Sequence, residues 1–422
     1  MNTTQMRTTL RSHPLKSARR EYSWLAMILF LLFLVFVFAP PSMLEEQFGN
    51  LGRVRVLLAL CLYAYLLTHI ERSVPLELFF RSRVFIACMA FTLVDLLSRI
   101  IFNWDSNSTW QTAKLDVTLL SVGLWTYMIF SESQIIRKLP WLIVILVTLV
   151  SAISLVDDFI RQPVAARFTA GFGEQRLDPN DTAYVICWGV VTAMFLFWQK
   201  VSKVRKLLLA GATVFMMGSL LLTGSRGGFL VLFVVVFMYV VSTRNIKFII
   251  IVTALWSLSL ALVLAYPDLL PQSQRSVSMF RFSTLDDFLE LDSNLSRLPA
   301  QRAALVAWLN NPIYGIGGGR FVTDGRHYFD IQTLFIGIGP HNSYLLTMAE
   351  LGIIGFCCYI WWLISLYKGI RRHRAYGLAA PLITGIVAGF FTTCVPSWHI
   401  MFVLTGVVAR LDALAVIAAH DH

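Results

Sequence analysis

Long apolar runs, separated by short polar segments, recur along the 422 residues of this chain. Each run holds roughly 17 to 20 apolar residues, the length that a helix needs to cross the hydrocarbon core of a bilayer. The runs lack the period-two alternation that the strands of a membrane barrel show. The pattern therefore predicts an all-α polytopic membrane protein with about twelve transmembrane helices. These helices are expected near residues 24–40, 54–70, 84–102, 115–130, 141–156, 182–198, 207–223, 227–243, 248–265, 343–363, 378–395 and 399–417.

Composition supports this fold class and argues against two kinds of ligand. Hydrophobic residues make up 57% of the chain and charged residues only 14%, which is more apolar than a soluble protein of this size needs. All six cysteines fall inside apolar runs, where we expect buried hydrophobic residues and neither disulfides nor metal ligands. The net charge of +11 is spread over loop ends, so no nucleic-acid partner is expected.

The distribution of Lys and Arg predicts the orientation of the helices. Basic residues are concentrated in the N-terminal segment and in alternate short loops, which places both termini in the cytoplasm. The first run, Trp24 to Ala39, would also fit a signal peptide, but Pro40 and Pro41 leave no good cleavage site, so we expect a retained span. The expected segments are a cytoplasmic N-terminus (1–23), helices one to nine (24–265), a large periplasmic loop (266–342), helices ten to twelve (343–417) and a cytoplasmic tail (418–422).

Two outer segments are long, 157–181 and 266–341, and loops of such length usually carry function. The second has helical patterns over 283–291 and 299–309, followed by a glycine-rich turn from Asn311 to Phe321. The glycines resemble a phosphate-cradling loop, but no strand precedes them and no Lys-Ser/Thr follows. We expect them instead to let the loop pack closely on the membrane surface.

His341 is the first candidate for chemistry, because it stands in Pro340–Tyr344 where the large loop meets an apolar span. Imidazole is the side chain best matched to removing a hydroxyl proton near neutral pH. The alternative is that His341 only caps the helix or binds a structural water.

Arginines form a second set of candidates. Arg226 lies in the tight turn between spans seven and eight, so it must stand at the outer membrane face, where a charge is costly unless it has a partner, a function or room to snorkel. Arg297 and Arg302 belong to the large loop and could simply be solvated; Arg320 and Arg326 are weaker candidates of the same kind.

Acidic residues in the other long outer segment lie between arginines. Arg167 and Arg176 flank the Asp-Pro-Asn-Asp turn at 178–181, and either Asp178 or Asp181 could be the N-cap of span six. The expected topology puts these residues, the arginines above and His341 on one face. Several guanidinium groups with one imidazole suit a pyrophosphate leaving group.

Four motifs in chain order resemble those of the O-antigen ligase and polymerase superfamily of bacterial membrane glycosyltransferases. They are Arg167 with the turn at 178–181; Leu-Thr-Gly-Ser-Arg-Gly-Gly at 222–228; Ser-Arg-Leu at 296–298 with Ala303–Leu305, Asn311–Pro312 and Gly315–Gly317; and Pro-His-Asn-Ser-Tyr at 340–344 with Glu350–Gly352. Together they cover about residues 160–360. One departure is Glu174–Leu177, since many members go directly from Gly to the Pro-Asn turn, which leaves the role of Arg176 open.

The resemblance implies a GT-C-like fold in the bacterial inner membrane, with a periplasmic active site and inverting transfer of a glycan from an undecaprenyl-pyrophosphate carrier. His341 would activate the acceptor hydroxyl, and Arg297 would act in catalysis. No cofactor is implied, and no metal is expected because no His pair at ligand spacing and no repeated Asp motif occurs in the outer segments. The pyrophosphate contacts that the resemblance implies are Arg226 and Arg297, with Arg297 and not Arg302 as the arginine of the large loop. Arg302 and Arg167 are further candidate contacts, with Asp178, Asn180, Asp181 and Asn342 in secondary positions.

Four functions remain open within these observations. A ligase would join the glycan to lipid A-core, a polymerase would extend the lipid-linked glycan, and an oligosaccharyltransferase would act on a protein serine. A transporter of lipid-linked sugars would place charges near the membrane midplane. Mid-span charges are few here, Asp95 being the clearest, and the candidates cluster at the outer face, which favours an enzyme. Among the enzymes, length favours the ligase, because no added soluble domain is expected after span twelve.

Overall fold

The computed structural model describes residues 76–103, 119–128, 138–161, 171–172, 175–176, 179–243, 292–328, 339–391 and 395–420, with a few single positions between them. Its longer helices are α6 (Arg83–Asn103), α9 (Leu139–Arg161), α10 (Pro179–Phe197), α11 (Lys203–Thr223), α12 (Arg226–Thr243), α17 (Asp292–Asn310), α19 (Ser343–Arg372), α20 (Ala379–Ala388) and α21 (Val395–His420). Shorter elements are α5 (Leu76–Phe80), α18 (Phe321–Asp324), η2 (Gly325–Tyr328) and η3 (Tyr376–Leu378), and two-residue strands β1 (Gly171–Phe172) and β2 (Gln175–Arg176) pair antiparallel.

Six helices among the described residues are long and apolar enough to cross a membrane, which confirms a multi-pass helical protein. They coincide with the spans expected at 84–102, 141–156, 182–198, 207–223, 343–363 and 399–417. Shorter apolar helices occupy Leu119–Met128, Gly227–Met238 and Tyr376–Ala388. The spans expected at 24–40 and 54–70, and most of 248–265, lie outside the described residues, so the count of twelve stays a prediction.

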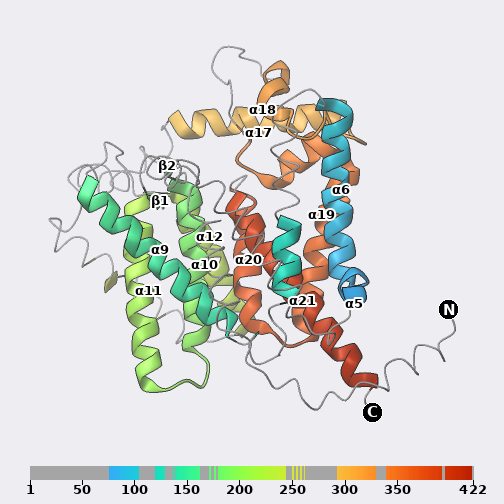
Figure 1. Cartoon of the computed structure of the whole chain (residues 1–422). Coiled ribbons are helices and arrows are strands. Elements are labelled where there is room, and N and C mark those ends of the chain that lie inside the picture. The colour runs from blue at the N-terminus through green and yellow to red at the C-terminus, as the bar shows by residue number, and fades with distance from the viewer. Residues whose placement is uncertain are drawn as a thin grey trace.

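The helices lie side by side in a bundle with α10 near its centre (Figure 1). Helix α10 packs against α9, α11, α12 and α20, while α19 packs against α6 and α21. Large aromatic side chains fill the interior, and Trp125, Trp188 and Trp362 are fully buried. This aromatic core fixes how the helices sit against one another and therefore where their ends lie.

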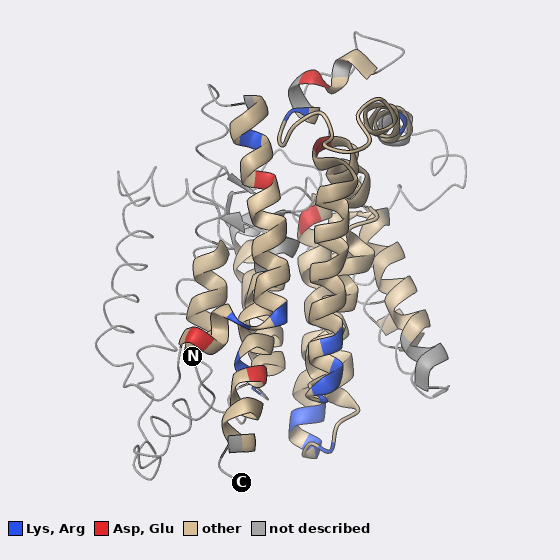
Figure 2. Cartoon of the chain, turned by 90° about the vertical axis from the view of Figure 1, so that its right-hand side faces the viewer, with Lys and Arg blue, Asp and Glu red and all other residues tan. Residues whose placement is uncertain are grey.

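The two ends of the bundle differ in character. Helices α10, α12 and α19 all begin at the end across which α17 lies, which we call the loop end (Figure 1). Helix α11 begins and α19 finishes at the opposite end, which we call the basic end because Lys and Arg gather toward it on α19 (Figure 2). This separation is the one that the positive-inside pattern predicts.

Helix α19 is broken at Gly352, where φ is 62° and ψ is −163°, although the sequence suggested one continuous span. The break frees backbone groups that a membrane interior cannot satisfy with water. The glycine-rich turn satisfies them: Ile316 and Gly317 donate their N–H groups to the carbonyls of Ala349 (2.9 Å) and Glu350 (3.0 Å). In return, the N–H of Ile353 donates to the Pro312 carbonyl at 2.9 Å.

The same turn is fastened to α6. The N–H of Gly318 donates to Ser98 Oγ at 2.9 Å, and a Cβ on Gly318 would come within 3.0 Å of Asp95 Oδ1. The glycines therefore pack closely against side chains of α6 and against the backbone of α19. The expected packing of this loop on the membrane surface stays a prediction.

Candidate active site

A hydrogen bond between two of the sequence motifs stands at the loop end. Asn180 lies in the first turn of α10, and its Oδ1 accepts a hydrogen bond of 2.8 Å from Ser225 Oγ, immediately before α12. Ser225 also caps α12, because its Oγ accepts from the N–H of Gly228 at 3.2 Å. The turn at 178–181 and the turn before Arg226 are thus one local structure.

Two glycines after Arg226 allow α12 to approach α10 closely. A Cβ on Gly227 would collide with the hydroxyl of Tyr184, and one on Gly228 would lie 2.6 Å from the Cβ of Ala183. Gly224, with φ of 56°, ends α11 in the left-handed conformation. The sequence around Arg226 is therefore what a tight turn pressed against α10 requires, and it fixes Arg226 as the first residue of α12.

The end of α20 joins this turn to the start of α19. Tyr184 donates its hydroxyl to the Phe391 carbonyl at 3.2 Å, and the N–H of Ser343 donates to the Gly389 carbonyl at 2.7 Å. Helix α20 ends at Ala388, well before the expected residue 395, because the chain turns at Gly389 to make these contacts. The loop-end starts of α10, α12 and α19 are thereby held in one group.

His341 lies directly before the cap of α19. Asn342 is the N-cap, since its Oδ1 accepts from the N–H groups of Tyr344 (3.0 Å) and Leu345 (2.9 Å), so the alternative that His341 caps the helix is wrong. His341 is half-buried and has φ of 47°, a left-handed conformation that non-glycine residues seldom adopt. Such strain is often found at functional sites.

Helix α17 carries the arginines of the large loop to the same end. It begins at Asp292, earlier than the pattern over 299–309 indicated. A stripe of alanines, Ala300, Ala303, Ala304 and Ala307, packs with Ala349 of α19, with Leu345 and Leu346 at the edge of the cluster. Small side chains let the two helices approach closely, so α17, which carries the third motif, packs against the first turns of α19, which carry the fourth.

The structure places the other candidates as follows. Asp181 lies inside the first turn of α10 and is not its cap, and Arg302 is exposed on α17. Arg320 forms an ion pair of 2.7 Å with Asp324, which gives this weaker candidate a local role. Only the backbone is described for Arg226 and Arg297, and for Arg176 in β2 and Arg326 in η2; Arg167 and Asp178 lie outside the described residues.

Sequence reasoning missed Ser225 and Tyr184. Ser225 had a recognisable signal, because a serine just before an apolar run that starts a helix is an N-cap pattern. Tyr184 had none, since an aromatic residue in an apolar span is usually plain core, and only the tertiary contact with Gly227 distinguishes it.

The start of α12 is suited to an anion. Arg226 is the first residue of α12 and therefore stands at the positive end of the helix dipole, where an anion is favoured. The first turn of α12 contains no acidic residue that would repel an anion. Within the described part of the chain, no group of three or more His, Cys, Asp or Glu is arranged to hold a metal ion. The groups at these helix starts that are able to bind an anion are arginines, backbone N–H groups and the hydroxyl and amide groups of the turn.

Comparison with known proteins covers three of the four motifs, since the first, at 167 and 178–181, lies before the matched segment. Residues 211–360, from α11 to the middle of α19, match the family model described as O-antigen ligase. No curated protein matches the chain. The matched segment includes the turn before Arg226, helix α17, the glycine-rich turn and His341.

Proposed function

We propose that this chain, in which residues 211–360 match the O-antigen ligase family model, transfers a glycan from undecaprenyl pyrophosphate to lipid A-core. The observation that carries this proposal is the grouping of three motifs by the Ser225–Asn180 hydrogen bond and the contacts of Gly389 and Phe391. This grouping brings the helix start that bears Arg226 together with the one that follows His341.

Binding of the donor is the first step. Arg226 and Arg297 bind the pyrophosphate, with Arg302 and Arg167 as further contacts, because guanidinium groups hold phosphate oxygens in pairs. The start of α12 adds a positive dipole end with no acidic residue in its first turn. These groups supply the charge that a divalent cation would otherwise provide beside a pyrophosphate.

Transfer follows as a single displacement. The acceptor hydroxyl oxygen attacks the anomeric carbon of the glycan while His341 takes its proton, and the bond from that carbon to the phosphate oxygen breaks. The electron pair leaves with the undecaprenyl pyrophosphate, whose new charge Arg226 and Arg297 stabilise. Attack opposite to the leaving group inverts the anomeric carbon. A base is needed on the acceptor side because an alcohol is a poor nucleophile until its proton is removed.

A transporter would require charged groups near the membrane midplane that are available to a substrate. Asp95, the clearest mid-span charge, forms an ion pair of 3.0 Å with Arg99 of the same helix and lies against the glycine-rich turn. That contact gives Asp95 a structural role in fastening the turn to α6. The polymerase and the protein-serine oligosaccharyltransferase use the same donor chemistry, and they differ from the ligase only in the acceptor.

A deletion strain separates these acceptors. If the chain is a ligase, its loss removes the long lipopolysaccharide ladder while undecaprenyl-linked polymer accumulates. Loss of a polymerase would leave lipid A capped with one repeat unit, and loss of a protein glycosyltransferase would leave the ladder intact. Complementation with the wild-type chain is the control, and either of the last two patterns would overturn the ligase.

A further inference from the structure

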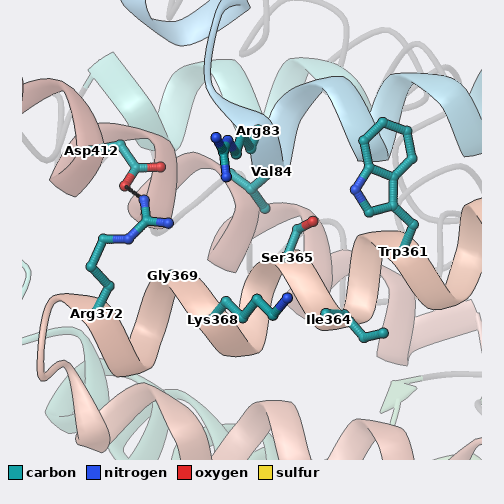
Figure 3. A pocket seen from close by; sticks show the side chains of 9 residues that line it. All are labelled: Arg83, Val84, Trp361, Ile364, Ser365, Lys368, Gly369, Arg372 and Asp412. Carbon is teal, nitrogen blue, oxygen red and sulfur yellow. Dashed lines mark hydrogen bonds and ion pairs between the residues drawn. The ribbon is translucent and has the colours of Figure 1, made fainter.

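A second group of cations lies at the basic end, apart from the candidate active site. A cavity of about 120 Å³ opens there between α6, α19 and α21 (Figure 3). Its wall contains three cations, one carboxylate and several apolar side chains. The residues on which the argument rests are Arg83, Lys368, Arg372, Asp412, Trp361 and Ile364.

The cations of this cavity exceed the carboxylates that could neutralise them. Asp412 Oδ1 lies 3.1 Å from Arg372 Nη1 and 2.7 Å from His373 Nε2, so this carboxylate is already shared. Among the described residues, no carboxylate forms an ion pair with Arg83 or Lys368. The cavity therefore keeps a net positive charge and would attract an anion.

The wall changes from apolar to basic along one face of α19. Trp361, Ile364, Ser365 and Lys368 follow one another at helical spacing and all line the cavity. Trp361 is 45% exposed and Ile364 is 44% exposed, as expected of side chains that face lipid. Arg83, the first residue of α6, lies across from this face (Figure 3).

We propose that this cavity binds an anionic phospholipid of the surrounding bilayer. The phosphate lies between Arg83 and Lys368, the hydroxyl of Ser365 can donate to it, and an acyl chain runs along Trp361 and Ile364. Basic pockets between helices near a membrane surface recognise anionic headgroups in this way. Cations that only snorkel to the interface need no hollow between helices, whereas here the helices leave a hollow beside them.

The test measures lipid retention by native mass spectrometry of the full chain, purified in mild detergent and exposed to phosphatidylglycerol or phosphatidylcholine. Wild type should retain phosphatidylglycerol in preference. Each removed cation should weaken this retention roughly fivefold, so the double variant Arg83→Gln/Lys368→Gln should lose about 25-fold. The matched control is Lys203→Gln/Arg371→Gln, which removes two exposed cations from the same end without touching the cavity wall.

Three results would overturn the proposal. The first is wild-type retention in the cavity variant, and the second is an equal loss in the control variant, which would indicate diffuse attraction. The third is that inorganic phosphate protects the protein against thermal unfolding as well as phosphatidylglycerol does, which would mean that no acyl chain is recognised. Should the double variant fail to fold, Lys368→Gln alone decides, because Lys368 is exposed and has no ion pair among the described residues.

Discussion

The two ends of the bundle hold their cations in different ways. At the loop end, Arg226 follows a turn fixed by Gly224, by the two hydrogen bonds of Ser225 and by the close approach of Gly227 to Tyr184. At the basic end, Arg83 and Lys368 are exposed side chains on helix faces beside lipid-facing residues.

This difference separates recognition of geometry from recognition of charge. A guanidinium whose backbone is fixed in a tight turn can meet a phosphate along one direction, so its planar shape matters. An exposed cation on a long side chain can reach an anion in many conformations, so its charge matters more than its shape. Substitutions that keep charge but change geometry should therefore damage the loop end and spare the basic end.

The largest expected contrast between the two ends is that they face opposite sides of the membrane. We predict that the loop end is periplasmic, so His327→Cys should be labelled by a membrane-impermeant thiol reagent and Ser202→Cys should not. Both positions are exposed, whereas Ser343 is buried and would be a poor reporter. Cells with a permeabilised outer membrane and an otherwise cysteine-free chain provide the measurement, and the reverse pattern would invert the orientation.

His341→Ala should reduce turnover at least about a hundredfold, because a positioned base contributes roughly that much or more. Donor binding should remain, so undecaprenyl pyrophosphate should still raise the unfolding temperature of the variant. His327→Ala is the matched control, since His327 is an exposed imidazole of the same loop. Normal turnover in His341→Ala, or a loss of donor binding as severe as in Arg226→Ala, would remove His341 as the base and make Asp178 or Asp181 the next candidate.

Arg226→Lys should lower turnover about tenfold or more, because an ammonium group cannot make the paired hydrogen bonds that a guanidinium makes with phosphate. Arg83→Lys should leave turnover and phosphatidylglycerol retention near their wild-type values, since only charge is required there. Turnover assays and lipid retention on the same preparations compare the two ends directly. Full activity of Arg226→Lys would mean that Arg226 only anchors α12 at the interface.

Ser225→Ala should destabilise the protein by about 1 kcal/mol, the usual cost of a lost N-cap, and should lower turnover through its contact with Asn180. Ser219→Ala is the control, because among the described residues the Ser219 hydroxyl donates only to the Phe215 carbonyl of its own helix. Thermal unfolding in detergent gives the stability. If the two variants lose equal stability and neither loses activity, the Ser225–Asn180 contact does not position the site.

Chelation should have the smallest effect, because arginines take the place of a divalent cation in the proposed mechanism. Turnover by the purified protein should be the same with and without a chelator of divalent metals. Loss of turnover that magnesium or manganese restores would contradict a metal-independent transfer. A matched assay with the Arg226→Lys variant would reveal whether a cation can compensate for the missing guanidinium.

Helices at 84–102, 141–156 and 182–198 could be read from the chain because apolar length alone decides whether a segment can cross a bilayer. The break within α19 and the end of α20 could not be read in this way. Gly352 interrupts α19, and α20 stops at Ala388, because backbone groups of other segments, Ile316, Gly317 and Ser343, supply the hydrogen bonds at those points. Local pattern contains no information about partners so distant in sequence.

At the candidate site, the kinds of side chain and their order could be read from the chain, and so could the expectation that alternating spans bring them to one end. Helix packing assigns a structural role to each residue: Asn342 caps α19, Ser225 joins α12 to α10, and Tyr184 fills the space beside Gly227. Hydropathy and charge act on each segment independently and can be read in order, whereas caps, close approaches and shared hydrogen bonds exist only once helices have packed.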